Sequence, residues 1–185
     1  MVYKMATTWK SQKQKPLEIK SIDGTITLRQ YTLKDSKEAF ALINRNRMHL
    51  SQFGDRTAAK YPTLESFEES IKNNQNVDRL RFGIWDAEGV LVGSINLTPD
   101  GDNPKRGEIG YYLGGELQNR GYMTKAVQTL TDYAFNTLNY EEIYGKVAVG
   151  NEASIKVLKK NGYIEAEVKN GEIIYTKSKS LNKTK

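Results

Sequence analysis

Hydrophobic and polar positions follow two different periods along this chain, and the changes between the periods predict the order of its secondary structure. Strict alternation with β-branched residues, as in TITLRQY, is typical of a strand, whereas apolar positions three and four residues apart are typical of a packed helix. The predicted strands are residues 25–31, 81–86, 90–97, 108–113, 142–149, 163–168 and 172–176. The predicted helices are residues 36–50, 64–74, 121–138 and 152–161.

Residues that favour turns and helix ends separate these segments. Gly89 and the pair Asn170-Gly171 predict two hairpins, because both turns need positive φ. Thr63 and Asn151 are suited to cap the helices that follow them. Strands interleaved with helices, with hairpins in the middle and at the end, indicate an α/β (α+β) fold built on a mixed sheet with helices on its faces.

Length and composition are those of a globular protein with one domain. The chain has 185 residues, of which 38% are hydrophobic and 27% charged, enough for one buried core. The net charge of +6 comes from the ends, since residues 1–20 hold five lysines and one glutamate and residues 176–185 hold four lysines. Subtracting these from 28 basic and 22 acidic residues leaves the middle at about −2. We predict one domain at residues 21–176 between basic flexible tails at 1–20 and 177–185.

The absence of certain residues narrows the kinds of site that the chain can form. It has no cysteine and a single histidine, His49, which argues against disulfides and against metal sites built on thiolate or imidazole. No apolar run reaches the roughly 18 residues of a membrane span, and the first residues lack the apolar stretch of a signal peptide. We therefore expect a cytoplasmic protein without metal or membrane attachment.

The segment ELQNRGYMTKAV, residues 116–127, places an arginine and a glycine directly before a predicted helix. The first turn of a helix exposes unpaired N–H groups and the positive end of the helix dipole, and both attract phosphate. Gly121 lets the backbone approach a ligand closely, and Arg120 supplies charge nearby. A simple turn explains the same residues, so both interpretations stay open on this ground alone.

Two longer segments, EIGYYLGGELQNRGYMTKAV and NEASIKVLKKNGY, resemble the GNAT N-acetyltransferases, in particular their RimJ/RimL-like branch. The resemblance covers residues 25–176 and implies the GNAT fold, whose central sheet is mixed, mostly antiparallel and of about seven strands, with helices on both faces. It implies acetyl-CoA as cosubstrate and no metal. The motif implied to hold the pyrophosphate is Gln118, Asn119, Arg120, Gly121, Tyr122 and Met123. Met123 stands where glycine or alanine is usual, although its backbone N–H can still donate.

The same resemblance implies roles around the acetyl group. Asn151 would hydrogen-bond the pantetheine arm, and Ser154 would act near the sulfur as a catalytic residue. The N–H of Leu113 or Tyr112 would polarise the thioester carbonyl where two strands separate. From the residues alone, Asn151 is also explained as a helix cap.

Two catalytic positions of the wider family hold other residues here. Leu158 stands where many members have a tyrosine, and Lys146 stands where related enzymes have a glutamate. Glu108 is therefore the candidate base that deprotonates the amine. Its alternative is a surface residue paired with Lys105 or Arg106.

The segment after the first predicted helix is predicted to face the acceptor amine, although a solvated helix end explains it equally well. The candidate substrate residues are His49 and Phe53 of this segment and Tyr112 of a predicted strand. Arg47, Arg56 and Tyr61, in the same segment, could also shape the acceptor site.

The predicted activity is N-acetylation of a primary amine by direct attack in a ternary complex, since no cysteine could carry an acyl group. The resemblance implies a protein N-terminal α-amine as acceptor, such as that of a ribosomal protein. The alternatives are a small amine (polyamine, amino acid or aminoglycoside), a non-catalytic acetyl-CoA-binding protein, or a ribosome-associated module that uses its lysine tails. We expect no strong nucleic-acid binding, and a homodimer stays open.

Overall fold

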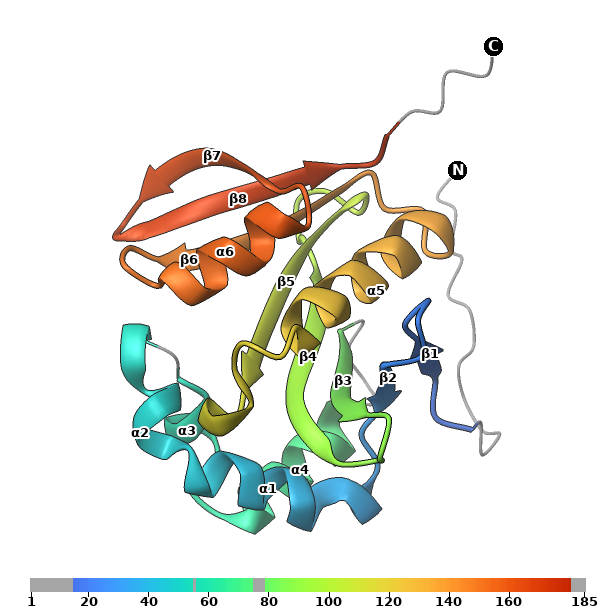
Figure 1. The fold of residues 1–185 in the computed structure, drawn as a ribbon, viewed down its shortest axis with the longest axis vertical. Helices are drawn as coiled ribbons and strands as arrows, with labels where there is room; N and C mark the ends of the chain where they lie inside the picture. The colour runs from blue at the N-terminus through green and yellow to red at the C-terminus, as the bar shows by residue number, and fades with distance from the viewer. Residues whose placement is uncertain (1–14, 55, 75–78, 181–185) are drawn as a thin grey trace, which may run out of the picture.

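A computed structural model describes residues 15–54, 56–74 and 79–180 of the chain. These residues form an eight-stranded sheet flanked by helices, drawn in Figure 1. In order across the sheet, the strands are β1 (Glu18–Lys20), β2 (Ile26–Gln30), β3 (Leu80–Asp86), β4 (Leu91–Pro99), β5 (Arg106–Leu113), β6 (Glu142–Ala148), β8 (Glu172–Ser178) and β7 (Ile164–Lys169). The mixed, mostly antiparallel sheet is confirmed, and β1 adds an eighth strand.

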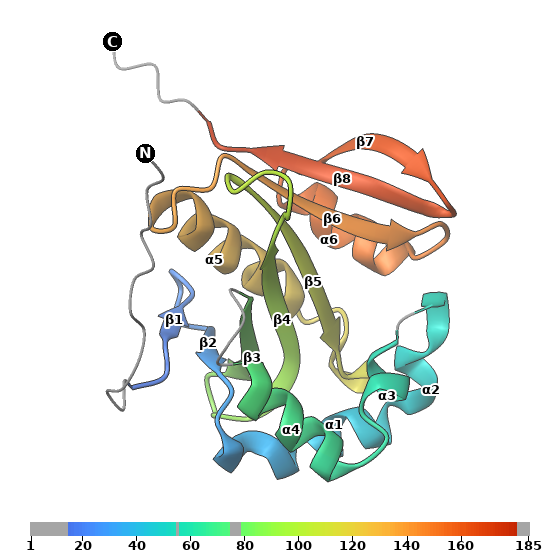
Figure 2. The ribbon, with the colours of Figure 1, turned by 180° about the vertical axis from the view of Figure 1, so that it is seen from behind.

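The helices lie on both faces of the sheet, as predicted. They are α1 (Ser36–Arg45), α2 (Arg47–Leu50), α3 (Thr57–Lys60), α4 (Leu64–Asn74), α5 (Tyr122–Asn136) and α6 (Glu152–Lys160), with 3-10 turns η1 (Leu33–Asp35), η2 (Gln52–Gly54) and η3 (Gly115–Leu117). Helix α5 crosses in front of the sheet in Figure 1, whereas α4 lies in front of it in Figure 2.

The face under α5 and α6 holds the larger group of buried side chains. Alternate strand residues point to this face, including Ile84 of β3 and Ile95 of β4. They meet the apolar stripe of α5, whose buried members include Ala126, Val127 and Leu130. Burying one such side chain contributes about 1.5 to 3 kcal/mol, so the apolar stripe fixes the position of α5.

The opposite face packs against α1 and α4. Trp85 and Leu91 come from the sheet, and Leu42 and Phe67 come from the helices. The sequence predicted that Trp85 is a core residue, and its exposed fraction of 4% confirms this. Helices thus pack on both faces of the sheet, and this packing holds the strands that carry the site in place.

The joint between β5 and β6 is the only parallel pair within the part of the sheet that is described. Its register covers three pairs, from Arg106 opposite Glu142 to Glu108 opposite Tyr144. Beyond these pairs, β5 continues to Leu113 and β6 to Ala148, but the two strands no longer pair with each other. The two strands therefore diverge and leave a wedge in the middle of the sheet.

The single helix predicted over residues 36–50 is wrong at Asn46. There the backbone leaves the helix, with φ −110° and ψ 15°, and α1 ends while α2 begins. The side chain of Asn46 donates to the carbonyl of Leu42 and accepts from the N–H of Gly115, at 2.9 Å each. A contact 69 residues away in sequence overrides the helical pattern.

Other boundaries also differ from the prediction. Strand β1 lies inside the predicted N-terminal tail, because Ile19 pairs with Leu28 of β2, and β8 extends beyond residue 176 to Ser178. Helix α3 forms within the predicted linker after residue 50, and α5 ends at Asn136, short of the predicted residue 138. The outer parts of the predicted tails, 1–14 and 181–185, lie outside the described residues.

The predicted turn and cap residues are confirmed. Asn170 and Gly171 have φ of 53° and 80° in the β7–β8 hairpin, and Gly89 has φ of 79° in the β3–β4 hairpin. The hydroxyl of Thr63 accepts from the N–H of Ser66 at the start of α4.

Candidate active site

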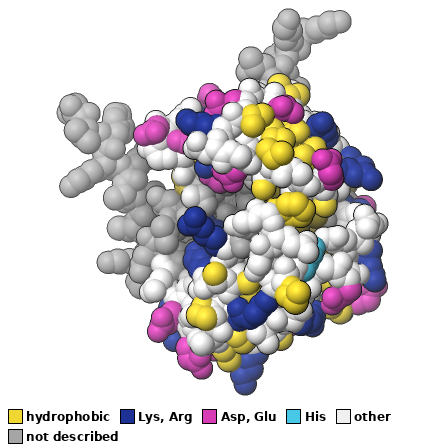
Figure 3. Space-filling view, turned by 90° about the vertical axis from the view of Figure 1, so that its left-hand side faces the viewer, with side chains coloured by type: hydrophobic (Ala, Val, Ile, Leu, Met, Phe, Trp, Pro, Cys, Tyr) yellow, Lys and Arg dark blue, Asp and Glu magenta, His cyan; other side chains and the backbone are white. Residues whose placement is uncertain are grey.

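The wedge between β5 and β6 opens into a cleft of about 350 Å³. Its walls come from five regions: η2 with α3, residues of β3 and β4, the diverging parts of β5 and β6, the first turns of α6, and Glu172 at the start of β8. The cleft thus reaches from the α3 side of the sheet to the α6 side. Figure 3 looks onto the edge of the molecule where these two sides face each other.

Tyr111 and Tyr112 occupy opposite faces of β5, as alternation predicts, and both line the cleft. The hydroxyl of Tyr111 donates to the carbonyl of Ser154 at 3.3 Å. The hydroxyl of Tyr112 is buried and has no hydrogen-bond partner in the described part of the chain. Burial raises the pKa of both phenols, so both stay protonated at neutral pH.

The start of α6 forms the opposite end of the cleft. Asn151 caps this helix, because its side-chain oxygen accepts from the N–H of Ser154 at 3.2 Å. Both residues line the cleft, together with Leu158 one turn further along. The cap interpretation of Asn151 is confirmed, and the same residue lies on the cleft wall.

The start of α5 has the geometry of an anion site. Gly121 adopts φ 81° as the N-cap, no side chain caps the helix, and the space around the glycine Cα is open. Asn119, two residues earlier, also has positive φ, at 62°. This loop does not line the cleft itself. The uncapped N–H groups of a 15-residue helix and the open glycine fit a pyrophosphate group.

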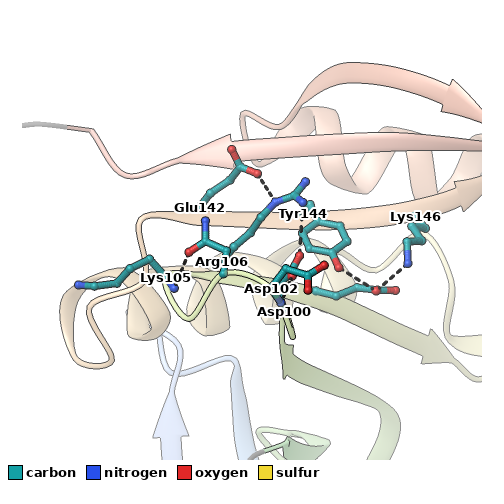
Figure 4. Close-up of polar contacts among 9 residues, drawn as sticks. Asp100, Asp102, Lys105, Arg106, Glu142, Tyr144 and Lys146 are labelled. Atoms are coloured by element: carbon teal, nitrogen blue, oxygen red, sulfur yellow. Dashed lines mark hydrogen bonds and ion pairs between the residues drawn. The ribbon is translucent and has the colours of Figure 1, made fainter. Parts of the chain in front are cut away.

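Glu108 lies at the closed end of the wedge, and it does not line the cleft. Its carboxylate accepts from Lys146 Nζ at 2.9 Å and from the hydroxyl of Tyr144 at 3.2 Å. In Figure 4 these contacts are the dashed lines that start at the labelled Lys146 and Tyr144. Desolvation and the charge of Glu108 raise the pKa of Tyr144 to about 12.

The predicted alternative, pairing of Glu108 with Lys105 or Arg106, is wrong. Those two side chains bind Glu141, Glu142 and Asp100 instead.

The predicted acceptor residues separate in space. Phe53 lines the cleft, is 53% exposed and adopts φ 56°, which is uncommon for a residue with a side chain. His49 does not line the cleft, and its ring contacts the side-chain amide of Gln118 at 3.0 Å. Arg47 supports the backbone by donating to the carbonyls of Ala58 and Tyr61.

Sequence reasoning missed three cations of the cleft wall. Lys60 of α3 and the neighbours Arg79 and Arg81 all line it. Arg81 was placed in a predicted strand without a role. The available signal was the spacing along the strand. Residues 81, 83 and 85 point to the same face of the sheet, so Arg81 shares the face of Trp85, which packs against α1 and α4.

The sequence model described as the acetyltransferase (GNAT) domain matches residues 25–164. The chain belongs to this acetyltransferase family. Members of the family use acetyl-CoA as acetyl donor. The activity class is therefore that of an acetyltransferase enzyme, and the fold predicted from the sequence is confirmed.

Individual relatives carry different acceptors in their names. A putative ribosomal N-acetyltransferase, YdaF of Bacillus subtilis, is 28% identical over 150 residues, which cover 78% of this chain and 80% of the relative. A spermidine N(1)-acetyltransferase of Vibrio cholerae is 26% identical over 125 residues, covering 66% and 70%. The solved structure of RimL, a ribosomal L7/L12 α-N-protein acetyltransferase in complex with coenzyme A, has a TM-score of 0.76 at 21% identity, covering 87% and 98%.

The described ranges contain neither a membrane-spanning helix nor a candidate metal site. No helix there is both long and apolar enough to cross a bilayer. No group of three histidine, aspartate or glutamate side chains there is placed to hold a metal ion.

Proposed function

We propose that this enzyme transfers the acetyl group of acetyl-CoA directly to the α-amine at the N-terminus of a protein. The observation that carries the proposal is the wedge between β5 and β6, through which one cleft connects the α6 side of the sheet with the α3 side. Two substrates that enter from opposite sides can meet there without a covalent enzyme intermediate. Holding both in one geometry supplies much of the rate enhancement.

The cofactor enters from the side of α5 and α6 in this proposal. The N–H groups at the start of α5, beside Gly121, hold the pyrophosphate, and Arg120 adds charge. The pantetheine arm then lies in the wedge, where Asn151 can hydrogen-bond it and Ser154 is near the sulfur. The side chain of Met123 points into the core and is 6% exposed, so its departure from the family pattern leaves the loop open.

The ladder between β4 and β5 indicates which N–H group meets the thioester oxygen. Gly114 donates to the carbonyl of Val92, its partner in the register. Because bonded and non-bonded pairs alternate along an antiparallel ladder, Tyr112 also donates toward β4. The N–H groups of Tyr111 and Leu113 then point the other way, into the wedge. Of the two residues predicted from the sequence, Leu113 is therefore the better donor to stabilise charge on the oxygen.

Glu108 is the proposed base, acting directly or through water. It sits where the wedge closes, and the hydroxyl of Tyr144 and the ammonium of Lys146 hold its carboxylate in place. Taking the proton from the amine before attack allows transfer below the pKa of the amine. Ser154, beside the sulfur, is the proposed group that assists departure of the thiolate.

The names of YdaF and RimL support a protein α-amine, whereas the spermidine relative favours a polyamine. The two acceptors differ in charge, and the cleft wall at the α3 end carries Arg56, Lys60 and Arg81. A polyamine carries several positive charges that these side chains repel. We therefore favour the peptide acceptor.

The test has two stages. A thermal melt with acetyl-CoA at about 100 times its dissociation constant should raise stability by about 2.7 kcal/mol, whereas NAD or ATP should leave the melting temperature unchanged. Coenzyme A release is then followed with a peptide that has a free N-terminus and with the same peptide blocked at its N-terminus but carrying an internal lysine. Acetylation of the first peptide alone is expected. No melting shift, or preference for the lysine, would contradict the proposal.

A further inference from the structure

Arg81 is a buried cation at the α3 end of the cleft. Its exposed fraction is 8%, and its side chain lines the cleft from β3. The guanidinium lies 4.7 Å from the ring of Phe67, 5.0 Å from that of Tyr61 and 5.1 Å from that of Tyr31. One nitrogen donates to the hydroxyl of Ser70 at 2.8 Å.

No carboxylate among the described residues lies within 4.0 Å of the Arg81 guanidinium. The three rings offset part of the cost of burying this charge. A guanidinium has five N–H donors, and among the described residues only one of them has a side-chain partner, the hydroxyl of Ser70. Buried charges are normally paired, so an anion from outside the chain would complete this site.

Further cations surround the same end of the cleft. Arg79 lies directly before β3 and also lines the cleft, and burial together with the charge of Arg81 lowers the pKa of Arg79. Arg56 and Lys60 line the wall from α3 and the residue before it. Figure 3 shows dark blue side chains in the middle of this side of the molecule. Their mutual repulsion would be relieved by a bound anion.

Tyr112 supplies a second, uncharged donor. Tyr112 lines the cleft, and its hydroxyl is fully buried and has no hydrogen-bond partner within the described ranges. Arg81 and Tyr112 both line this one cleft. A buried hydroxyl without a partner costs stability unless a ligand satisfies it.

We propose that Arg81 and Tyr112 bind a carboxylate that the acceptor carries close to its amine. The inference rests on the proposed acetyl transfer and specifies its acceptor as an acidic one. The carboxylate can be an aspartate or glutamate side chain near the N-terminus of a peptide, or the α-carboxylate of a free amino acid. Either matches a guanidinium, which binds planar carboxylates through two parallel hydrogen bonds.

The experiment compares acceptors that differ only in charge. The full chain with saturating acetyl-CoA is given three peptides of identical sequence except for aspartate, asparagine or lysine at the second position, and also glutamate, its α-amide, and spermidine. A charged hydrogen bond that is lost should lower kcat/KM roughly 10- to 100-fold. We expect the aspartate peptide to exceed the asparagine peptide by this factor and the lysine peptide by more. Preference for glutamate over its α-amide would identify the free amino acid as the source.

The variant Arg81→Gln separates recognition from folding. It should reduce the ratio of kcat/KM for the aspartate and asparagine peptides toward one, because only the acidic peptide loses a partner. A folding defect would lower both values and leave the ratio unchanged. Arg81→Lys should retain part of the ratio, and Lys37→Gln, at an exposed position of α1 outside the cleft, should retain all of it.

Three results would overturn the inference. Equal use of neutral and acidic peptides, a preference for spermidine, or an unchanged ratio in Arg81→Gln would each exclude the anion site while leaving acetyl transfer intact. If acetyl-CoA binds but no acceptor of any charge is acetylated, the proposed function fails and the inference fails with it.

Discussion

The two ends of the cleft are built in different ways. The end toward α5 and α6 depends on backbone geometry: two strands separate there and Asn151 caps α6, and the uncapped start of α5 at Gly121 lies outside the cleft wall on this side. The end toward α3 uses side chains, above all Arg81 among aromatic rings. Backbone sites recognise groups common to all substrates of a family, whereas side-chain sites can change without altering the fold. The first end therefore indicates the reaction, and the second indicates the acceptor.

The largest effect is expected on the side of α5 and α6, where backbone geometry forms the proposed cofactor site. Gly121→Val should weaken acetyl-CoA binding at least 100-fold, because φ of 81° strains a β-branched residue and its side chain would cover the N–H groups. Calorimetric titration with acetyl-CoA measures the change. Gly89→Val is the matched control, since Gly89 has φ of 79° with similar open space but lies in a distant hairpin. If both variants bind like the parent, the helix start does not hold the pyrophosphate.

Glu108→Gln tests the proposed base, which lies at the closed end of the wedge between β5 and β6. Loss of a base should slow transfer roughly 100-fold at a pH below the pKa of the amine. The loss should shrink as the pH rises, because the amine then loses its proton without help. The pH profile of kcat/KM shows this, and Glu141→Gln, at an exposed residue paired with Lys105, is the control. A loss that is equal at every pH would remove Glu108 from proton transfer.

Ser154→Ala should have a smaller effect on catalysis. We expect transfer to slow about tenfold, the low end of general acid assistance, with unchanged acetyl-CoA affinity. The melting temperature should stay near that of the parent, because the helix cap uses the backbone N–H of Ser154 and the side chain of Asn151. Single-turnover kinetics separates the chemical step from binding. Parent-like rates would reduce Ser154 to a structural residue.

Asn46→Ala should have the smallest effect on the reaction, and it tests how the two regions are connected. The change leaves the N–H of Gly115 without its acceptor and removes a donor to Leu42. We expect a loss of about 1 to 3 kcal/mol in the free energy of unfolding. Denaturant titration measures it. Unchanged stability would mean that water replaces the side chain and that the junction does not hold α1 against η3.

The sequence predicted seven of the eight strands, the helix caps and the glycine-containing loop before α5, because each of these depends on neighbours in the chain. Alternation, Asn170-Gly171 and the glycine before α5 are local signals. The break at Asn46 and the short helix α3 depend on contacts distant in sequence, so the local pattern missed them. The same reason explains Arg81, whose partners Phe67 and Ser70 come from a helix packed on its strand.

The parallel joint of β5 and β6 also has a consequence for folding order. The pairs β2–β3 and β5–β6 must wait for long intervening segments, whereas β3–β4, β4–β5 and β7–β8 are hairpins that close locally. Only three residue pairs form the joint, and the whole of α5 lies in the chain between the two strands. Because loop closure costs entropy before its contacts repay it, we expect β5–β6 to be among the last contacts to form. The wedge, and with it the reaction centre, would then be completed only when the rest of the domain is already folded.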